Sequence, residues 1–303
     1  MESIFKSEDA EIPSVVYKFG KSELIGHLLE HRTALFRSTS RQNDINENLW
    51  DYSALVERQI NILNQDIELS YRSNSSHFQS REDFDFLFGA NRFAESFVNL
   101  RIYRQIQKLM SGIGAICFSA SCENSLMWAH YADSSAGICV GISSEARFLK
   151  EATFCSQVGL RRVCYSDQRV KISPQNIEES FLDIIYTKSK DWAYESELRA
   201  VCDLPDGQDQ RLFPIEPEEV REVIVSVGTP LEDILRLEKL ANVYPHVAIA
   251  IAVPDTESFR NVILPLPNRY SLERIQSPFD LEPISSAMLK RSPEKVGRLL
   301  GFL

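Results

Sequence analysis

Two glutamates near the start of a predicted strand are the residues best placed to do acid–base chemistry. They stand in the segment KSKDWAYESELRAV (188–201), where Glu195 and Glu197 precede the strand-like run 198–201. Because side chains alternate along a strand, residues two apart point to the same face. Two carboxylates that face together repel each other, and one of them is expected to have a raised pKa. The alternative is a solvated strand end with two exposed acids, paired with Arg199.

A second group of candidate residues lies in the segment 124–133, which we predict to be a short helix. On a helix Met127 and Tyr131 share a face, as do Trp128 and Tyr131, whereas His130 points elsewhere. A histidine beside aromatic side chains can act as an acid or base near neutral pH, and the rings can stack on a planar ligand. The alternative is a buried helix whose tyrosine and histidine find backbone partners.

Several well-known catalytic motifs are absent from the sequence. There is no GxGxxG before a helix, no P-loop, no GxSxG and no HExxH. A Cys–His nucleophile would need Cys117 and His130, but Cys117 lies in an apolar run, where a thiol tends to be inert. None of the six cysteines forms a CxxC pair, so we expect reduced thiols rather than a zinc site or a disulfide framework.

Composition restricts the class of protein. The chain has 303 residues, of which 44% are hydrophobic and 25% charged, as in ordinary globular proteins. Its net charge of −10 argues against broad non-specific binding to nucleic acid. The longest apolar runs, such as 247–253, are far too short to span a membrane, and the first residues do not resemble a signal peptide. We therefore expect a cytoplasmic protein with no membrane partner.

The hydrophobic pattern predicts one α+β domain over residues 1–303. The expected strands cover 15–19, 35–38, 115–119, 137–142, 162–165, 198–202, 223–227 and 247–253, and the expected helices cover 22–31, 124–133, 175–187 and 230–242. Ser22 is the expected N-cap of the first helix. Residues 50–111 carry apolar side chains at helical spacing, so we expect a helical insertion there within a mostly antiparallel or mixed sheet protein.

Three segments together resemble a bacterial family of unknown function, the domain-of-unknown-function family 2971. They are VYKF (16–19), CFSASCENSLMWAHYADSSAGICVGI (117–142) and KSKDWAYESELRAV (188–201). The family pattern has a Tyr-Lys-aromatic strand, a Met-Trp-x-His-Tyr helix and a Lys-x-x-x-Trp-x-x-Glu-x-Glu-[aromatic/Leu]-Arg segment. This sequence differs in an early loop, where the family usually carries Phe-Asn-Asp-Pro and this chain has Gln-Asn-Asp-Ile at 42–45.

The order of these parts is also similar, more weakly, to the ADP-ribosyltransferase fold. In that fold a first strand offers a polar residue to the NAD ribose, a middle element surrounds the nicotinamide, and a late strand begins with Glu (or Gln)-x-Glu. The matching parts here are Tyr17-Lys18, then Ser119 with the helix 128–131, then Glu195-x-Glu197. The resemblance implies an ADP-ribosyltransferase-like sheet and NAD as a substrate, with no metal. It also implies a toxin or phage-defence effector that modifies a protein or nucleic-acid acceptor.

This resemblance assigns roles to the candidate residues. Glu197 would stabilise the positive charge that develops on the ribose as the nicotinamide–ribose bond breaks. Glu195 would orient or deprotonate the acceptor nucleophile. Tyr131 or Trp128 would stack on the nicotinamide, and Lys18 would hold a ribose or phosphate. The other predicted members of the site are Tyr17, Ser119, His130, Asn43 and Asp44.

Two other functions fit the same residues. Asp44, Glu195 and Glu197 could bind a divalent metal through oxygen ligands, as in a nuclease or a phosphotransfer enzyme. The chain could instead be a non-catalytic sensor or partner-binding module.

Overall fold

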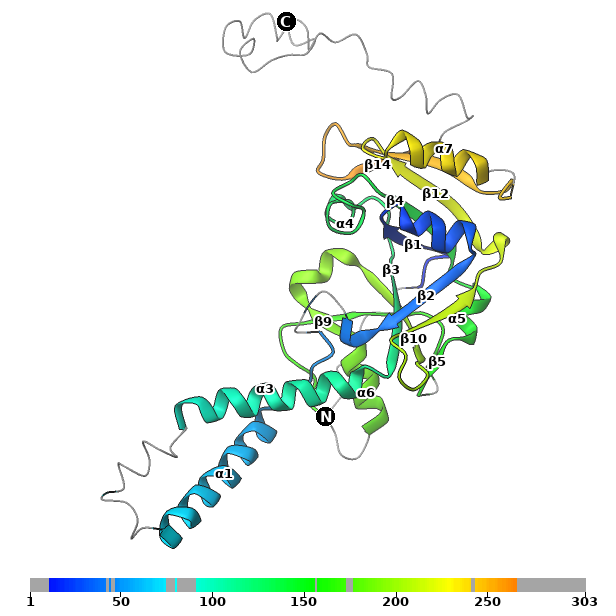
Figure 1. The fold of residues 1–303 in the computed structure, drawn as a ribbon. Helices are drawn as coiled ribbons and strands as arrows, with labels where there is room; N and C mark the ends of the chain where they lie inside the picture. Colours follow the sequence, from blue (N-terminus) through cyan, green and yellow to red (C-terminus); the bar gives the residue numbers. More distant parts are fainter. Residues whose placement is uncertain are drawn as a thin grey trace, which may run out of the picture.

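A computed structural model shows an α+β protein built on a large mixed, mostly antiparallel sheet with several helices (Figure 1). The structure describes residues 11–41, 44, 47–74, 80, 91–155, 157–172, 177–240 and 243–265. The class predicted from the hydrophobic pattern is therefore confirmed. The assignment of residues 1–303 to a single domain stays a prediction.

The central sheet has ten strands. They are β1 Val15–Gly20, β2 Thr33–Ser38, β3 Ile113–Ser119, β4 Ile138–Ser143, β7 Arg161–Arg162, β10 Glu197–Asp203, β11 Gln210–Pro214, β12 Val220–Ser226, β13 Ala248–Pro254 and β14 Asn261–Pro265. Within it, β12 and β13 are parallel and the other neighbouring strands pair antiparallel. Two short ribbons complete the strands: β5 Thr153–Phe154 with β6 Gln157–Val158, and β8 Cys164–Ser166 with β9 Thr187–Ser189.

Strand β3 is the branch point of the sheet. On one edge it pairs with β10 over its whole length, residues 113–119 with residues 197–203. On the other edge β1 pairs with β3 only at Tyr17 and Ser119, and β2 pairs with β3 only at residues 114–115. Strands β1 and β2 therefore separate from each other over the middle of β3. We call this place the fork.

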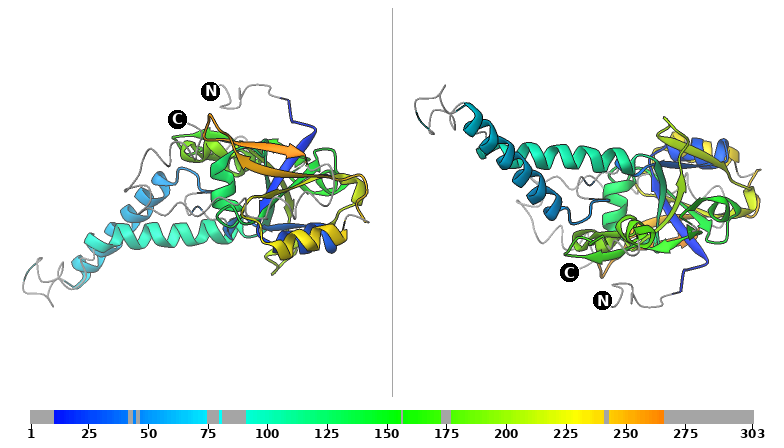
Figure 2. Two further views of the ribbon diagram at one scale, coloured as in Figure 1. Left: turned by 90° about the horizontal axis from the view of Figure 1, so that it is seen from above. Right: turned by 90° about the horizontal axis from the view of Figure 1, so that it is seen from below.

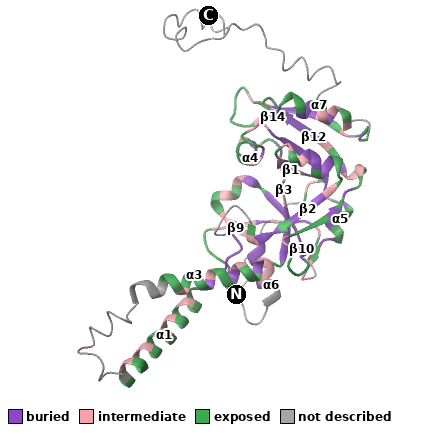
Figure 3. Cartoon of the chain, viewed as in Figure 1, coloured by how far each residue is buried: buried purple, intermediate pink, exposed green. Residues whose placement is uncertain are grey.

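Buried side chains form three clusters on the faces of the sheet. The largest packs η1 (Ile25–Glu30), α5 (Arg147–Glu151) and α7 (Leu231–Leu240) against the strands. The second packs α6 (Ile177–Ile185) against the sheet-proximal half of α3 (Asn91–Met110). The third packs α4 (Ser125–Tyr131) against β1, β4, β12 and β13. Figure 3 shows the buried residues concentrated in the central strands, as burial of apolar surface predicts.

Two long helices lie in the segment predicted to be a helical insertion. They are α1 (Ser53–Asn74) and α3, and the Tyr52 hydroxyl donates a hydrogen bond to the Asn99 side chain at 2.9 Å where they meet. Both helices project away from the sheet in all three views (Figures 1 and 2). We call α1 and α3 together the arm.

One predicted helix has a different form. The segment 22–31 contains a π-helical turn, η1, and Ser22 does not cap it. The Ser22 hydroxyl instead donates a hydrogen bond at 2.5 Å to the buried carboxylate of Asp233. The helical turn begins later than predicted, with Leu24 at the N-cap position, so the Ser22 side chain is not placed to cap it. Within the described residues, no helix is both long enough and apolar enough to cross a membrane.

Candidate functional site

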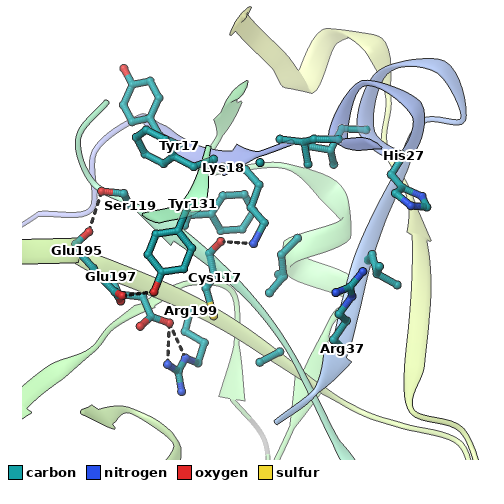
Figure 4. A pocket seen from close by; sticks show the side chains of 18 of the residues that line it. Tyr17, Lys18, His27, Arg37, Cys117, Ser119, Tyr131, Glu195, Glu197 and Arg199 are labelled. Atoms are coloured by element: carbon teal, nitrogen blue, oxygen red, sulfur yellow. Dashed lines mark hydrogen bonds and ion pairs between the residues drawn. The ribbon is translucent and has the colours of Figure 1, made fainter. Parts of the chain in front are cut away.

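A pocket of about 640 Å³ lies at the fork, a volume within the range of small-molecule sites (Figure 4). Strands β1, β2, β3 and β10, the turn η1 and helix α4 all contribute side chains. The lining residues that carry charge, a thiol or a hydroxyl group are Tyr17, Lys18, Lys21, Glu23, His27, Thr33, Arg37, Ser38, Arg41, Glu47, Cys117, Ser119, Tyr131, Lys188, Glu195, Glu197 and Arg199. The pocket therefore brings the glutamate pair, α4 and β1 together, although they are far apart in the sequence.

A buried ammonium group holds three carboxylates together on one side of this pocket. The Nζ atom of Lys188 lies 2.6 Å from Glu195 Oε2, 3.2 Å from Glu197 Oε2 and 3.8 Å from Glu47 Oε2. None of these four side chains is more than 5% exposed. Charges this deeply buried are tolerated only when they are paired and hydrogen-bonded, so each group depends on the others.

Arg199 completes this group of charges. Its Nε and Nη2 atoms donate to Glu197 Oε1 at 2.9 and 2.7 Å, Nη2 also donates to Glu47, and Nη1 donates to the Ile185 carbonyl at 2.5 Å. The predicted neutralisation of the acids by Arg199 is therefore confirmed for Glu197. We call Glu47, Lys188, Glu195, Glu197 and Arg199 the ion cluster. Three carboxylates face two cations, which leaves an excess of one negative charge.

The two glutamates of the pair have pKa values shifted in opposite directions. Burial alone would raise the pKa of Glu197, but the charges of Arg199 and Lys188 outweigh it and lower the pKa to about 2. The pKa of Glu195 is raised, because burial is the largest effect on it. Lys188 and a hydrogen bond from Tyr131 lower this pKa, but by less. For Lys188, burial is outweighed by Glu197, Glu47 and Glu195, so its pKa is raised and it stays protonated.

The carboxylates of Glu195 and Glu197 meet, but not because both residues lie in one strand, as their spacing predicts. Only Glu197 lies in the strand, whereas Glu195 ends the 3-10 helix η4 (Lys190–Glu195). Between them Ser196 has a positive φ of 47°, an uncommon conformation for a residue other than glycine. This turn brings both carboxylates to Lys188. The alternative of two exposed acids is wrong, because Glu195 and Glu197 are each only 4% exposed.

Helix α4 and strand β3 fix the position of Glu195. The Tyr131 hydroxyl donates to Glu195 Oε1 at 2.5 Å, and the buried Ser119 hydroxyl donates to the Glu195 backbone carbonyl at 2.7 Å (Figure 4). Asn124 caps α4 and donates to the Tyr194 carbonyl at 2.7 Å, which ties α4 to η4. Met127 and Tyr131 both line the pocket, as the helical spacing predicts. Ser119 thus holds Glu195 in place through the backbone.

Two predicted members of the site lie outside the pocket lining. Trp128 is only 1% exposed, packs edge-on against Phe19 and donates to the Cys122 carbonyl at 2.7 Å. The prediction that Trp128 stacks on a ligand is therefore wrong. His130 is exposed and hydrogen-bonds to the Tyr194 hydroxyl at 2.8 Å, away from the acid pair. Helical spacing gives relative directions but cannot tell which face of a short helix meets the sheet.

The neighbouring residues of β1 have separate partners. The Tyr17 hydroxyl donates to Glu222 Oε1 on β12 at 2.8 Å, whereas Lys18 Nζ donates to the Cys117 carbonyl on β3 at 2.9 Å (Figure 4). Lys18 thus satisfies a backbone acceptor at the fork, on the edge of β3 where neither β1 nor β2 pairs with it. Burial lowers the pKa of Lys18, although Cys117 and Glu197 oppose the shift. Burial and the charge of Glu197 raise the pKa of the Cys117 thiol to about 12, so this cysteine is unreactive as predicted.

Of the two predicted residues in the early loop, the structure describes only Asp44. Asn43 lies outside the described residues. Asp44 accepts a hydrogen bond from Trp192 Nε1 at 3.0 Å and lines a second pocket of about 310 Å³. Glu47 and Lys188 also line that second pocket, but Glu195 and Glu197 do not, so Asp44 does not share a pocket with the acid pair. In the part of the chain that the structure describes, no group of three or more His, Cys, Asp or Glu side chains is arranged to hold a metal ion.

The wall opposite the ion cluster is basic. Lys18, Arg37 and His27 reach it from β1, β2 and η1 (Figure 4). Arg37 is exposed and forms no ion pair with any described carboxylate, whereas Arg41 at the rim pairs with Asp209 at 2.5 Å. We call Lys18, His27 and Arg37 the basic wall. The pocket thus has an acidic side and a basic side.

Sequence reasoning missed Glu47 and gave no role to Lys188 or Arg37. Glu47 meets Arg199 across 152 positions of the sequence, and its loop carries no motif. The available signal was Arg199 itself, since an arginine inside an apolar strand needs carboxylate partners when it is buried. Lys188 is part of the quoted motif, but only the structure shows that its ammonium group lies between the carboxylates and pairs with them.

The comparisons with known proteins support one of the two resemblances. Residues 127–200 match the model of a protein family of unknown function, DUF2971. This segment runs from α4 into β10 and contains Tyr131 and most of the ion cluster. No curated protein sequence and no solved structure matches the chain. The resemblance to the ADP-ribosyltransferase fold receives no support from these comparisons.

Proposed function

We propose that the chain binds NAD in the pocket at the fork and cleaves its nicotinamide–ribose bond, as an ADP-ribosyltransferase-like enzyme. The observation that carries this proposal is the acid pair with oppositely shifted pKa values, which lies opposite a basic wall in one pocket. Pairs of titratable groups shifted in this way are typical of acid–base sites. The pocket geometry, rather than any relative, supports the assignment.

The charges of the pocket suit the charges of NAD. NAD carries a positive nicotinamide ring at one end and a negative diphosphate in the middle. The ion cluster, with its excess negative charge, would accept the nicotinamide ribose, and the basic wall would accept the diphosphate. Burial lowers the pKa of Lys18. An anionic group bound beside Lys18 would raise this pKa again and so favour the charged ammonium form.

The proposed reaction uses the two glutamates in different roles. As the bond between ribose C1′ and the nicotinamide nitrogen breaks, its electron pair goes to the nitrogen and positive charge develops on the ribose. Glu197, ionised at any physiological pH, stabilises that charge from a position already fixed by Arg199. The acceptor then attacks C1′ and gives its proton to Glu195, whose raised pKa suits a general base. Tyr131 orients Glu195.

The biological setting that we propose is a toxin or phage-defence effector, with a protein or nucleic acid as the acceptor. This part of the proposal rests on the resemblance in residue order alone. An enzyme that consumes NAD or modifies a cellular acceptor would suit such a role.

Thermal unfolding with and without NAD tests the binding step. A ligand present at about 100 times its dissociation constant stabilises a protein by about 2.7 kcal/mol, which is a readily measured shift. We expect NAD to raise the unfolding temperature of the wild type and of the control Glu218→Gln, which changes an exposed acid outside the pocket. Arg37→Gln should reduce the shift. No shift in the wild type at millimolar NAD would contradict the proposal.

A further inference from the structure

None of the side chains of helix α1 whose burial the structure describes is fully buried. Between residues 53 and 73 every side chain of α1 is exposed or half-buried (Figure 3). Helix α3 differs, because Ile102, Ile106 and Met110 are buried in the half next to the sheet. Helices in proteins gain most of their stability by packing an apolar face. The arm therefore has apolar surface that the described part of the chain leaves uncovered.

The uncovered apolar side chains form a line along α1. Leu55, Ile62 and Leu69 are 44, 43 and 61% exposed, and they recur every seven residues. A seven-residue repeat keeps side chains on one face over several turns, as in packed helical bundles. On α3, Phe97 and Leu100 are 68 and 46% exposed. Apolar surface that is contiguous in this way is typical of an interaction site.

The charges of the arm are separated along its length. The C-terminal half of α1 lies far from the sheet (Figure 2), and its charged residues are Asp66, Glu68 and Arg72. The charged residues of α3 between 96 and 110 are all basic: Arg101, Arg104 and Lys108. These three cations form no ion pair with a described carboxylate. In the far half of α1, Arg72 pairs with Glu68 at 3.0 Å, which leaves Asp66 as the acid with no ion pair among the described residues. In the near half of α1, Glu57 and Arg58 balance each other in charge, so the three cations of α3 give that end of the arm a net positive charge.

We propose that the arms of two copies of this chain pack antiparallel across a twofold axis and form a homodimer. In this arrangement the far half of α1 lies beside the near half of the partner's α3, so Asp66 faces the partner's Arg104. The symmetry repeats this contact, so Asp66 of one copy meets Arg104 of the other at both ends of the dimer. The line of Leu55, Ile62 and Leu69 becomes buried between the arms. The proposal is independent of the proposed reaction.

Sedimentation equilibrium of the full chain over a series of concentrations tests this proposal. We expect a dimer for the wild type, and a dissociation constant at least about tenfold weaker for Leu55→Gln/Ile62→Gln/Leu69→Gln. Leu212→Gln/Val227→Gln is the matched control, since these side chains are 53 and 57% exposed outside the arm. The control should remain dimeric. A wild type that is monomeric at every concentration, or a triple variant that dimerises as the wild type does, would overturn the proposal.

A charge exchange tests the antiparallel arrangement. Asp66→Lys and Arg104→Glu should each weaken the dimer, because each places like charges opposite one another. The double variant should recover dimer strength, since the pair is then reversed. Circular dichroism checks that each variant keeps its helices. A double variant that is weaker than both single variants would overturn the arrangement.

Discussion

Glu195 and Glu197 are two residues apart and bind the same ammonium group, yet their pKa values are shifted in opposite directions. The difference comes from Arg199, which donates twice to Glu197 and not to Glu195. A carboxylate with two strong cationic partners stays ionised, and its neighbour then titrates in the field of that fixed charge. The pair therefore offers one permanent charge and one proton-accepting group.

The lowered pKa of Glu197 predicts a loss of stability in acid. Its folded-state pKa of about 2 lies below the ordinary value of 4.5, so its contribution is present above pH 4.5 and is lost as the pH falls towards 2. The shift corresponds to about 3 kcal/mol. In Glu197→Gln this part of the pH dependence should disappear. The variant should also be less stable at pH 7, by about 3–5 kcal/mol, because a buried pair is broken.

Urea unfolding between pH 2 and pH 7 measures both effects. Glu218→Gln is the control, since Glu218 is exposed and should leave the curve unchanged. If Glu197→Gln kept the acid dependence of the wild type, the lowered pKa of Glu197 would be wrong.

The contact between Glu47 and Arg199 should appear as a strong energetic coupling. Glu47→Gln and Arg199→Met each leave a buried charge without its partner and should cost about 3–5 kcal/mol. The double variant should be more stable than the sum of the two losses predicts, by about 1–3 kcal/mol. The exposed pair Arg147–Glu151, 3.2 Å apart, is the control and should couple by less than about 0.5 kcal/mol. Additive losses at Glu47 and Arg199 would contradict the ion cluster.

Removal of the Tyr131 hydroxyl should change the pH dependence of turnover. Its hydrogen bond lowers the pKa of Glu195, so Tyr131→Phe should raise that pKa further. A general base is then ionised only at higher pH, so the acidic limb of the kcat/KM profile should move to higher pH. Tyr244→Phe loses a comparable hydrogen bond, to the Leu29 carbonyl, outside the pocket. A limb that moves equally in both variants, or in neither, would remove Tyr131 from the site.

Arg37 should contribute to binding rather than to the chemical step. A charge-assisted hydrogen bond to a phosphate is worth about 1.5–3 kcal/mol, so Arg37→Gln should raise the KM for NAD about tenfold or more. The value of kcat should stay near that of the wild type. Arg221→Gln changes an exposed arginine outside the pocket lining and should alter neither constant. A fall in kcat at unchanged KM would contradict this role.

The sequence predicted the buried strands better than the edges of the sheet. The expected strands 115–119 and 198–202 lie inside β3 and β10, because their apolar runs are continuous. Strands β11 and β14 were not predicted, since most of their side chains are exposed and their apolar runs are only two and three residues long. Strand pairing, and hence the fork, depends on contacts between distant segments, which local patterns do not record.

The candidate site was predicted only in part, because local patterns show some of its residues and not the contacts between distant segments. Glu195, Glu197 and Tyr131 were found because each lies in a dense local motif, and they do meet in one pocket. Trp128 was wrongly assigned to ligand stacking, because the sequence alone does not distinguish an aromatic side chain in the core from one at a ligand site. Glu47 escaped notice because its partners come from residues far along the chain.

The release of nicotinamide from NAD, followed over time with purified wild type, Glu195→Gln and Glu218→Gln, tests the central claim most directly. We expect turnover in the wild type and in Glu218→Gln, and at least about a hundredfold loss in Glu195→Gln, as removal of a general base predicts. Glu195→Gln should still show the thermal shift with NAD. Equal nicotinamide release by Glu195→Gln and the wild type, or none by the wild type at any NAD concentration, would contradict the account.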